Sequence, residues 1–177
     1  MTAVELLREG ATSGFQEFTK ALEGIQQPQA WAVLPPASEE YLHTDGSIHG
    51  IVLHAAEVKR MYGSICFRNT ETRWRDVANE IESFEPDWNA ALAYLHESHR
   101  YWMESWSSLT DEDLEADRPT NWPEPWPAWR IIRLMNHHDA YHAGQIAVLR
   151  YANGESDTPP PSCAEDVRQY CSDSPHW

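Results

Sequence analysis

The chain has 177 residues, which is enough for one domain with a sizeable core but tight for two. Its 28 Asp and Glu outnumber its 13 Lys and Arg, and the formal net charge of -15 argues against nucleic acids and anionic membranes as partners. No apolar run approaches the roughly 20 residues that cross a bilayer, and the N-terminus lacks the pattern of a signal peptide, so we expect a soluble, cytoplasmic protein.

The first two helices are predicted from apolar side chains that recur every three or four residues. The first helix stops at Gln26-Gln27-Pro28, and a connection with three prolines leads to Thr44 or Asp45, either of which offers an N-cap oxygen. The second helix then begins near Ser47. The two inward stripes are Val4, Leu7, Ala11, Phe15, Phe18, Leu22 and Ile25, and Ile51, His54, Val58, Met61 and Ile65.

A third helix follows the polar connection 68–82, and Glu85-Pro86-Asp87 supplies its start because proline suits the first helical position. Its apolar stripe continues to Leu109 with coiled-coil-like spacing. Residues 110–113 resemble a capping box for one short turn through Leu114. Residues 118–127 carry four prolines among tryptophans and are predicted to form a loop.

A fourth helix is expected to begin near Pro127 or Ala128 and to end at Asn153-Gly154, a typical C-terminal stop. We find no convincing alternating β pattern. The sequence therefore predicts an all-α protein with a four-helix bundle over residues 1–153 and an irregular tail over 154–177. The cysteines (Cys66, Cys163 and Cys171) are odd in number and lack Cys-x-x-Cys spacing, so a Cys163–Cys171 bridge is permitted but not required.

Histidines on two predicted helices form a candidate metal site. His138 and His142 are one helical turn apart, so their imidazoles lie one above the other and face the core with Ile131, Leu134, Met135, Tyr141, Gln145 and Leu149. His54 lies between Ile51 and Val58 on the second helix and also points inward, whereas His49 lies about 140° around that helix. Three protein nitrogens with an open position are a common form of catalytic zinc site.

Simpler explanations of the histidines remain open. The four-residue spacing occurs by chance in many helices, and a plain bundle with hydrogen-bonded core histidines would also bury such rings. His99 faces inward on the third helix and is either a core residue or a residue that lines the site. His96 and His137 are expected at the surface. The residues that could hydrogen-bond the ligands are Glu57, Asp139, Tyr141 and Gln145.

Two other kinds of metal site are disfavoured. A di-iron bundle needs Glu-x-x-His, but the residues three before His99 and His138 are His96 and Met135. The His-Glu-x-x-His motif of metalloproteases is absent because Asp139 follows His138. A mononuclear, histidine-rich site fits better.

Two further features suggest close contacts. Gly144 costs about 1 kcal/mol in a helix relative to alanine, and we attribute it to close approach of a neighbouring helix or ligand. The tryptophan-rich segment 121–129 either roofs the pocket or packs as a plug over the end of the bundle.

Three segments together resemble the DinB-like superfamily, which includes bacillithiol transferases and mycothiol-dependent maleylpyruvate isomerases. They are Gly46 to His54, Leu109 to Leu114 and, above all, His138-Asp139-Ala140-Tyr141-His142-Ala143-Gly144-Gln145-Ile146. The likeness spans most of residues 1–153. It implies a four-helix bundle with one inner metal ion, often nickel or zinc, bound by three histidines matching His54, His138 and His142. It also implies a homodimer.

The resemblance further implies a function, because family members of assigned activity use the metal to bind and activate a low-molecular-weight thiol. On this basis we expect a metal-dependent thiol S-transferase acting on a small-molecule electrophile, with the catalytic residues unassigned. The alternative is a non-catalytic metal-binding or dimerisation module, which the absence of an obvious general acid or base on the inner stripes favours in part.

Overall fold

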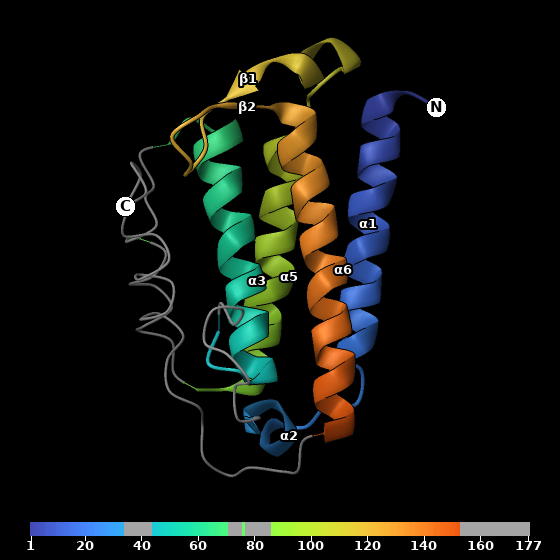
Figure 1. Ribbon diagram of the computed structural model, residues 1–177, viewed down its shortest axis with the longest axis vertical. Coiled ribbons are helices and arrows are strands. Elements are labelled where there is room, and N and C mark those ends of the chain that lie inside the picture. Colours follow the sequence, from blue (N-terminus) through green and yellow to red (C-terminus); the bar gives the residue numbers. More distant parts are fainter. Residues whose placement is uncertain (34–43, 71–75, 77–85, 153–177) are drawn as a thin grey trace.

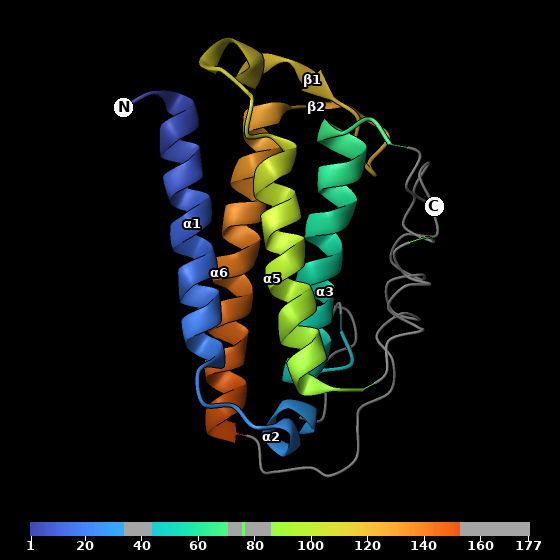
Figure 2. The same cartoon turned by 180° about the vertical axis from the view of Figure 1, so that it is seen from behind.

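The computed structural model describes residues 1–33, 44–70, 76 and 86–152, and this part of the chain is mostly helical. Four long helices, α1, α3, α5 and α6, run side by side along the long axis (Figures 1 and 2). The all-α prediction is therefore confirmed. No helix in the described ranges is long and apolar enough to cross a membrane. The elements are α1 (Ala3–Leu22), α2 (Gln27–Trp31), α3 (Ile48–Tyr62), the π-helix η2 (Gly63–Phe67), α5 (Trp88–Ser105), the 3-10 helix η3 (Asp111–Glu115), β1 (Asp117–Arg118), β2 (Trp126–Pro127) and α6 (Ala128–Ala152).

Side-chain caps fix where the long helices begin. Thr2 and Glu5 form a capping box at α1, and Asp87 caps α5 by accepting a hydrogen bond from the Ala90 amide at 2.7 Å. The sequence suggested that Pro86 is the first helical residue. In the structure Pro86 instead precedes the cap residue Asp87. Likewise Ser47 caps α3 itself, accepting from the Gly50 amide at 2.8 Å, and neither Thr44 nor Asp45 does.

The first connection differs from its prediction. Helix α1 ends at Leu22, and Pro28 lies in the first turn of α2, where its missing N–H costs nothing. Ile25 is buried although it lies outside α1, and its carbonyl accepts a hydrogen bond from the Trp88 indole at 3.0 Å. Helix α2 thus closes one end of the helix assembly (Figure 1).

The opposite end contains the predicted short turn η3, with its Thr110 capping box. Segment 118–127 was predicted as a loop, but its ends pair as two short antiparallel strands, with Arg118 opposite Trp126. Trp126 packs against the apolar core at this end and stacks with Trp122. Since the site histidines start ten residues into α6, roughly 15 Å along its axis, this segment packs on the end and does not roof them.

Helices α1 and α6 approach closely because α1 carries glycines at the contact. A Cβ on Gly10 would lie 2.8 Å from the Asn136 amide nitrogen, and one on Gly14 would lie 3.1 Å from the Asn136 carbonyl oxygen. This contact fixes α6 against α1. Helix α3 packs against both α5 and α6, so one face of α6 meets α3 across the core.

Candidate metal centre

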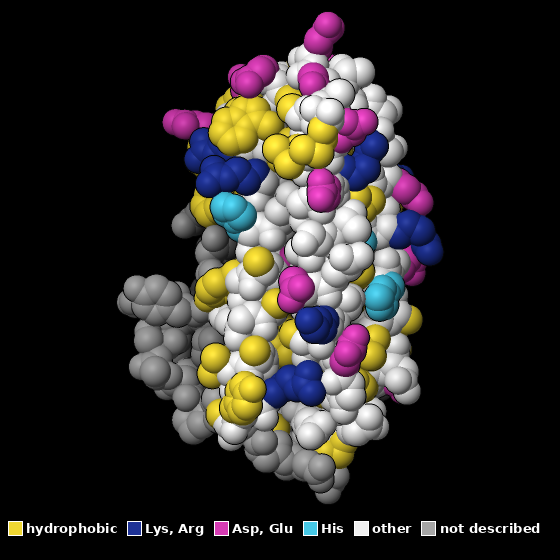
Figure 3. Space-filling model, turned by 90° about the vertical axis from the view of Figure 1, so that its right-hand side faces the viewer, with side chains coloured by type: hydrophobic (Ala, Val, Ile, Leu, Met, Phe, Trp, Pro, Cys, Tyr) yellow, Lys and Arg dark blue, Asp and Glu magenta, His cyan; other side chains and the backbone are white. Residues whose placement is uncertain are grey.

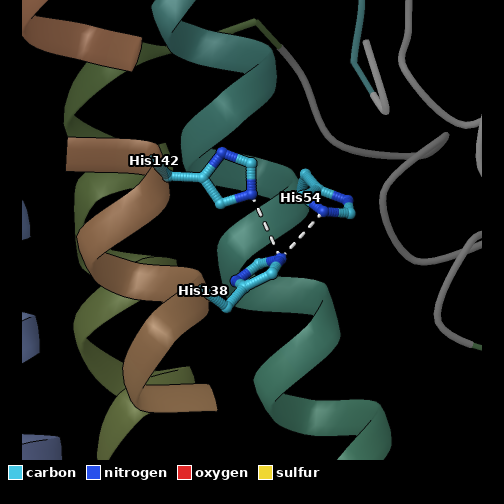
Figure 4. A group of neighbouring side chains, drawn as sticks. All are labelled: His54, His138 and His142. Atoms are coloured by element: carbon cyan, nitrogen blue, oxygen red, sulfur yellow. Dashed lines mark hydrogen bonds between the residues drawn. The ribbon is translucent and has the colours of Figure 1, made fainter. Parts of the chain in front are cut away.

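Three histidine side chains converge between α3 and α6 (Figure 4). The Nε2 atom of His138 lies 3.1 Å from Nε2 of His54 and 3.1 Å from Nε2 of His142. One potential ligand nitrogen of each ring lies within 4.8 Å of the others. The structure thus brings together the three residues that the sequence nominates.

Local helix geometry produces this arrangement. His138 and His142 stand one turn apart on α6, so their rings project from the same side, while His54 reaches across from α3 (Figure 4). His54 and His142 are buried, at 7% and 2% exposure, and His138 is half-buried. The site therefore lies at the edge of the core, with one ligand closer to solvent.

The inward stripe predicted for α6 is partly wrong. Leu134 and Tyr141 were placed toward the core but are 37% and 52% exposed. Asp139 is buried in their place, because its carboxylate forms an ion pair with Lys59 inside the helix assembly. The buried face of α6 is therefore rotated toward Asp139 relative to the prediction.

The donor set suits a divalent metal ion. A tetrahedral ion with metal–nitrogen distances of about 2.0–2.1 Å separates its ligand nitrogens by about 3.3–3.4 Å. This is close to the 3.1 Å between His138 Nε2 and the Nε2 atom of each of the other two rings. The Nε2 atom of His138 faces two other Nε2 atoms, and one N–H cannot point at both. A cation shared by three lone pairs resolves this conflict.

Hydrogen bonding also orients His142. Its Nδ1 lies 2.6 Å from Oε1 of Gln145, an acceptor, so Nδ1 carries the proton and Nε2 keeps its lone pair. The amide nitrogen of Gln145 donates in turn to the Tyr141 phenol oxygen at 3.0 Å. Such an outer hydrogen bond fixes the tautomer and ring orientation that a metal ligand needs. Of the four nominated supporting residues, Gln145 hydrogen-bonds a candidate ligand directly, whereas Tyr141 hydrogen-bonds Gln145.

Asp139, a third nominee, has a different partner. Its carboxylate meets Lys59 of α3, whose ammonium is wholly buried and lies 5.6 Å and 5.8 Å from the ring centroids of Phe15 and Phe18. Burial raises the pKa of Asp139, and Lys59 opposes that shift. Glu57, the fourth nominee, is also fully buried.

Sequence reasoning missed Lys59 because it lies beside the narrow stripe drawn for α3. Nearly every residue of α3 is buried, so protein surrounds the helix on almost all sides. The predicted apolar stripe marks only one of these buried sides. The available signal was Asp139, since a carboxylate on an inward face needs a partner of opposite charge.

The remaining histidines of the helices lie outside the cluster. His99 stacks on Phe15 with ring centroids 3.6 Å apart, and burial, with Lys59 and His96 nearby, lowers its pKa to about 3. It is therefore a half-buried residue that is neutral at pH 7 and packs on Phe15. His96 and His137 are exposed, as predicted. His49 is buried in the first turn of α3, and burial lowers its pKa to about 4 against the opposing effect of Asp87.

Cys66 is a free cysteine in the described part of the chain. It is buried, and burial raises the pKa of its thiol well above the ordinary value. A thiol protonated in this way is a poor nucleophile at neutral pH. Cys163 and Cys171, and hence the permitted bridge, lie outside the described residues.

Comparison with known proteins identifies the family of this chain. The family model for mycothiol S-transferases matches residues 7–153, which include all three clustered histidines. No curated protein and no solved structure gives a significant match. The matched segment covers most of the chain, and the family suggests a thiol S-transferase-like function with a small-molecule substrate. The chain belongs to the mycothiol S-transferase family, within the DinB-like superfamily.

Proposed function

We propose that this protein is a metal-dependent thiol S-transferase built on a DinB-like four-helix bundle. One divalent ion, nickel or zinc, is held by His54, His138 and His142, and the thiol is mycothiol, in keeping with the family. The convergence of three Nε2 atoms, with His142 oriented by Gln145, carries this proposal. Imidazoles leave the full positive charge on the ion because they are neutral ligands.

The chemistry requires a sulfur nucleophile near neutral pH. A divalent ion at this position would lower the pKa of a coordinated thiol, so that a thiolate is available to attack an electrophile. The sulfur forms a bond to the electrophilic carbon, the leaving group departs with its bonding electrons, and the thiol proton passes to solvent. The buried Cys66 does not compete as the nucleophile, since its own thiol stays protonated.

The residues of this chain position the reaction. Gln145 holds the His142 ring, and half-exposed Tyr141 holds Gln145 from the solvent side. His138 is less buried than the other two histidines, and this supports an approach of the thiol from the His138 side of the cluster. The surface is acidic overall, so the cation supplies the local positive potential that an anionic thiolate needs.

Metal content tests the site. Protein purified without an affinity tag should carry about one ion per chain, and His138→Ala and His142→Ala should both lose it. His137→Ala is the matched control, because this exposed neighbour on the same helix should leave metal content unchanged. Stoichiometric metal in both His138→Ala and His142→Ala would rule out the assigned ligands.

Thiol consumption tests catalysis separately. Metal-loaded protein is incubated with an alkylating electrophile and, in turn, mycothiol and other cellular thiols, and thioether formation is followed by liquid chromatography. We expect the highest rate with mycothiol and a loss of at least about 100-fold in His54→Ala. A rate unaffected by His54→Ala, with metal bound in the parent protein, would instead favour a non-catalytic metal-binding module.

A further inference from the structure

A chain of hydrogen bonds runs outward from the candidate metal centre and ends at Tyr141. When Nε2 of His142 binds a metal ion, the proton of that ring is on Nδ1, which therefore donates to Oε1 of Gln145. The amide nitrogen of Gln145 then donates to the Tyr141 phenol oxygen at 3.0 Å. Each contact has one possible donor, so the direction of both hydrogen bonds is fixed.

The direction of this chain turns the Tyr141 proton outward. An amide NH2 group can only donate, so the phenol oxygen accepts from Gln145 and its own O–H points elsewhere. Tyr141 is 52% exposed. The single acidic residue of α6, Asp139, is buried against Lys59, so no carboxylate of α6 competes for the tyrosine proton. Tyr141 therefore presents a hydrogen-bond donor on the solvent side of the metal centre.

Tyr141 also stands beside the least buried histidine of the cluster. It follows His138 by three residues, a spacing that makes the two side chains neighbours on the helix surface. Leu134, one turn before His138, is 37% exposed and adds an apolar surface. A Cβ built on Gly144 would meet no described atom within 4 Å. The close approach expected at this glycine is therefore not that of a helix in the described part of the chain, and a ligand has room there.

The charges around the site favour an uncharged electrophile. The chain has a formal net charge of -15, and exposed carboxylates lie on the neighbouring face, which α1 forms (Figure 3). An anionic electrophile would be repelled by this surface. An apolar substituent would instead contact Leu134 and the Tyr141 ring. These surroundings suit a neutral molecule that has an apolar substituent and an oxygen able to accept a hydrogen bond.

We propose that Tyr141 is a catalytic residue and that the electrophile is an uncharged epoxide with an apolar substituent. This inference rests on the proposed function, which supplies the thiolate. The sulfur forms a bond to one ring carbon while the bond from that carbon to the epoxide oxygen breaks, and the oxygen keeps the bonding electrons. Tyr141 donates a hydrogen bond to this oxygen as its negative charge develops. The oxygen then takes up one proton, which balances the proton released by the thiol, and the product is a thioether with a neighbouring hydroxyl group.

An epoxide benefits from this donor more than an alkyl halide does. A halide ion is a weak base and leaves without help, whereas the oxygen of an opening epoxide becomes a strongly basic alkoxide. A fixed hydrogen-bond donor stabilises such a localised charge in the transition state. The role of Tyr141 therefore depends on the leaving atom, and this dependence can be measured.

Two electrophiles with the same phenyl group test the role of Tyr141. Zinc-loaded protein and mycothiol are incubated with styrene oxide, which opens to an alkoxide, or with benzyl chloride, which releases chloride. Tyr141→Phe should lose about 100-fold in rate with styrene oxide and keep its rate with benzyl chloride. Tyr151→Phe is the matched control, because Tyr151 is 94% exposed on the same helix and should keep both rates.

Gln145→Glu tests the direction of the hydrogen bonds. A carboxylate still accepts from Nδ1 of His142, so zinc should stay bound, but it cannot donate, and the Tyr141 hydroxyl would turn toward it. The ratio of the styrene oxide rate to the benzyl chloride rate should therefore fall in Gln145→Glu although the tyrosine is present. An unchanged ratio in either Gln145→Glu or Tyr141→Phe would overturn the proposal.

Infrared spectroscopy gives a readout that does not depend on turnover. Acetophenone, an unreactive isomer of styrene oxide, is added to the zinc-loaded protein as the probe. Because a hydrogen bond weakens its carbonyl bond, the carbonyl stretch should lie at a higher frequency in Tyr141→Phe than in the parent protein and in Tyr151→Phe. Equal frequencies in the parent protein and Tyr141→Phe would overturn the proposal.

The two reactions also separate this proposal from the proposed function. A parent protein that accelerates the reaction with benzyl chloride but not with styrene oxide would overturn the epoxide assignment and leave the thiol S-transferase standing. A parent protein that accelerates neither reaction would overturn both.

Discussion

Lys59 of α3 and Asp139 of α6 form an ion pair that is almost wholly withdrawn from solvent. The same two helices supply the clustered histidines, and Asp139 directly follows His138. The ion pair thus joins α3 to α6 beside the candidate metal centre. A slip of either helix here would separate a carboxylate from its counter-charge in the core.

Removing one partner of this pair should destabilise the fold strongly. Lys59→Met leaves the Asp139 carboxylate buried without its counter-charge, and we expect a loss of about 3–5 kcal/mol in the free energy of unfolding. The double variant Lys59→Met/Asp139→Leu should lose much less, because it leaves no lone charge. Urea denaturation of both variants measures this, and a double variant as unstable as Lys59→Met would contradict it.

Acid should destabilise the protein through half-buried His99 and buried His49. The pKa of His99 is lowered to about 3 and that of His49 to about 4, both below the value of 6.5 for the unfolded chain. Below pH 6.5 the two histidines bind protons in the unfolded chain but stay unprotonated in the folded protein. The free energy of unfolding is therefore highest above pH 6.5 and falls as the pH drops toward the pKa values of the folded protein.

His99→Phe isolates one part of this acid sensitivity. The substitution keeps a ring against Phe15 but removes the titrating group, so the slope of unfolding free energy against pH between 6 and 4 should become shallower by about one proton. Urea titrations across this pH range provide the measurement. His96→Phe is the control, since His96 is exposed, and an equal change of slope there would argue against burial as the cause.

Loss of the Gln145 contact should weaken metal binding without abolishing it. Gln145→Leu removes the acceptor at 2.6 Å from His142 Nδ1, and losses of this kind cost about 10–100-fold in affinity. Competition against a chromogenic chelator measures the dissociation constant. Tyr141→Phe should have a smaller effect because it removes only the outer hydrogen bond to Gln145. A larger loss of metal affinity in Tyr141→Phe than in Gln145→Leu would contradict the proposed role of Gln145.

Bound metal should raise thermal stability by an amount that grows with the logarithm of the free metal concentration divided by the dissociation constant. A free concentration of 100 times the dissociation constant adds about 2.7 kcal/mol to the unfolding free energy. Zinc or nickel added to metal-free protein should therefore raise Tm. His138→Ala should show no such rise, and His137→Ala should behave as the parent protein does. A similar rise in His138→Ala would indicate binding elsewhere.

Much of this architecture follows from local sequence signals. The period of apolar residues and the cap residues locate α1, α3, α5 and α6 to within a few residues, because both depend on near neighbours in the chain. Two members of the candidate ligand set were accessible for the same reason, since a four-residue step stacks His138 on His142 in any helix.

What escaped prediction depends on contacts between distant segments. Lys59 is buried because α3 is covered on nearly all sides, which no stripe on α3 alone reveals. Arg118 and Trp126 pair as strands only because the chain folds back over the end of the helix assembly. The exposure of Tyr141 likewise follows from the rotation of α6 that brings Asp139 to Lys59.

X-ray absorption spectroscopy of the zinc-loaded protein, recorded with mycothiol present, tests the central claim most directly. We predict three nitrogen ligands with imidazole signatures at about 2.0–2.1 Å and one sulfur at about 2.3 Å that is absent without the thiol. A spectrum that mycothiol leaves unchanged, or one with fewer than three imidazoles, would contradict the account of a three-histidine centre that binds a thiol.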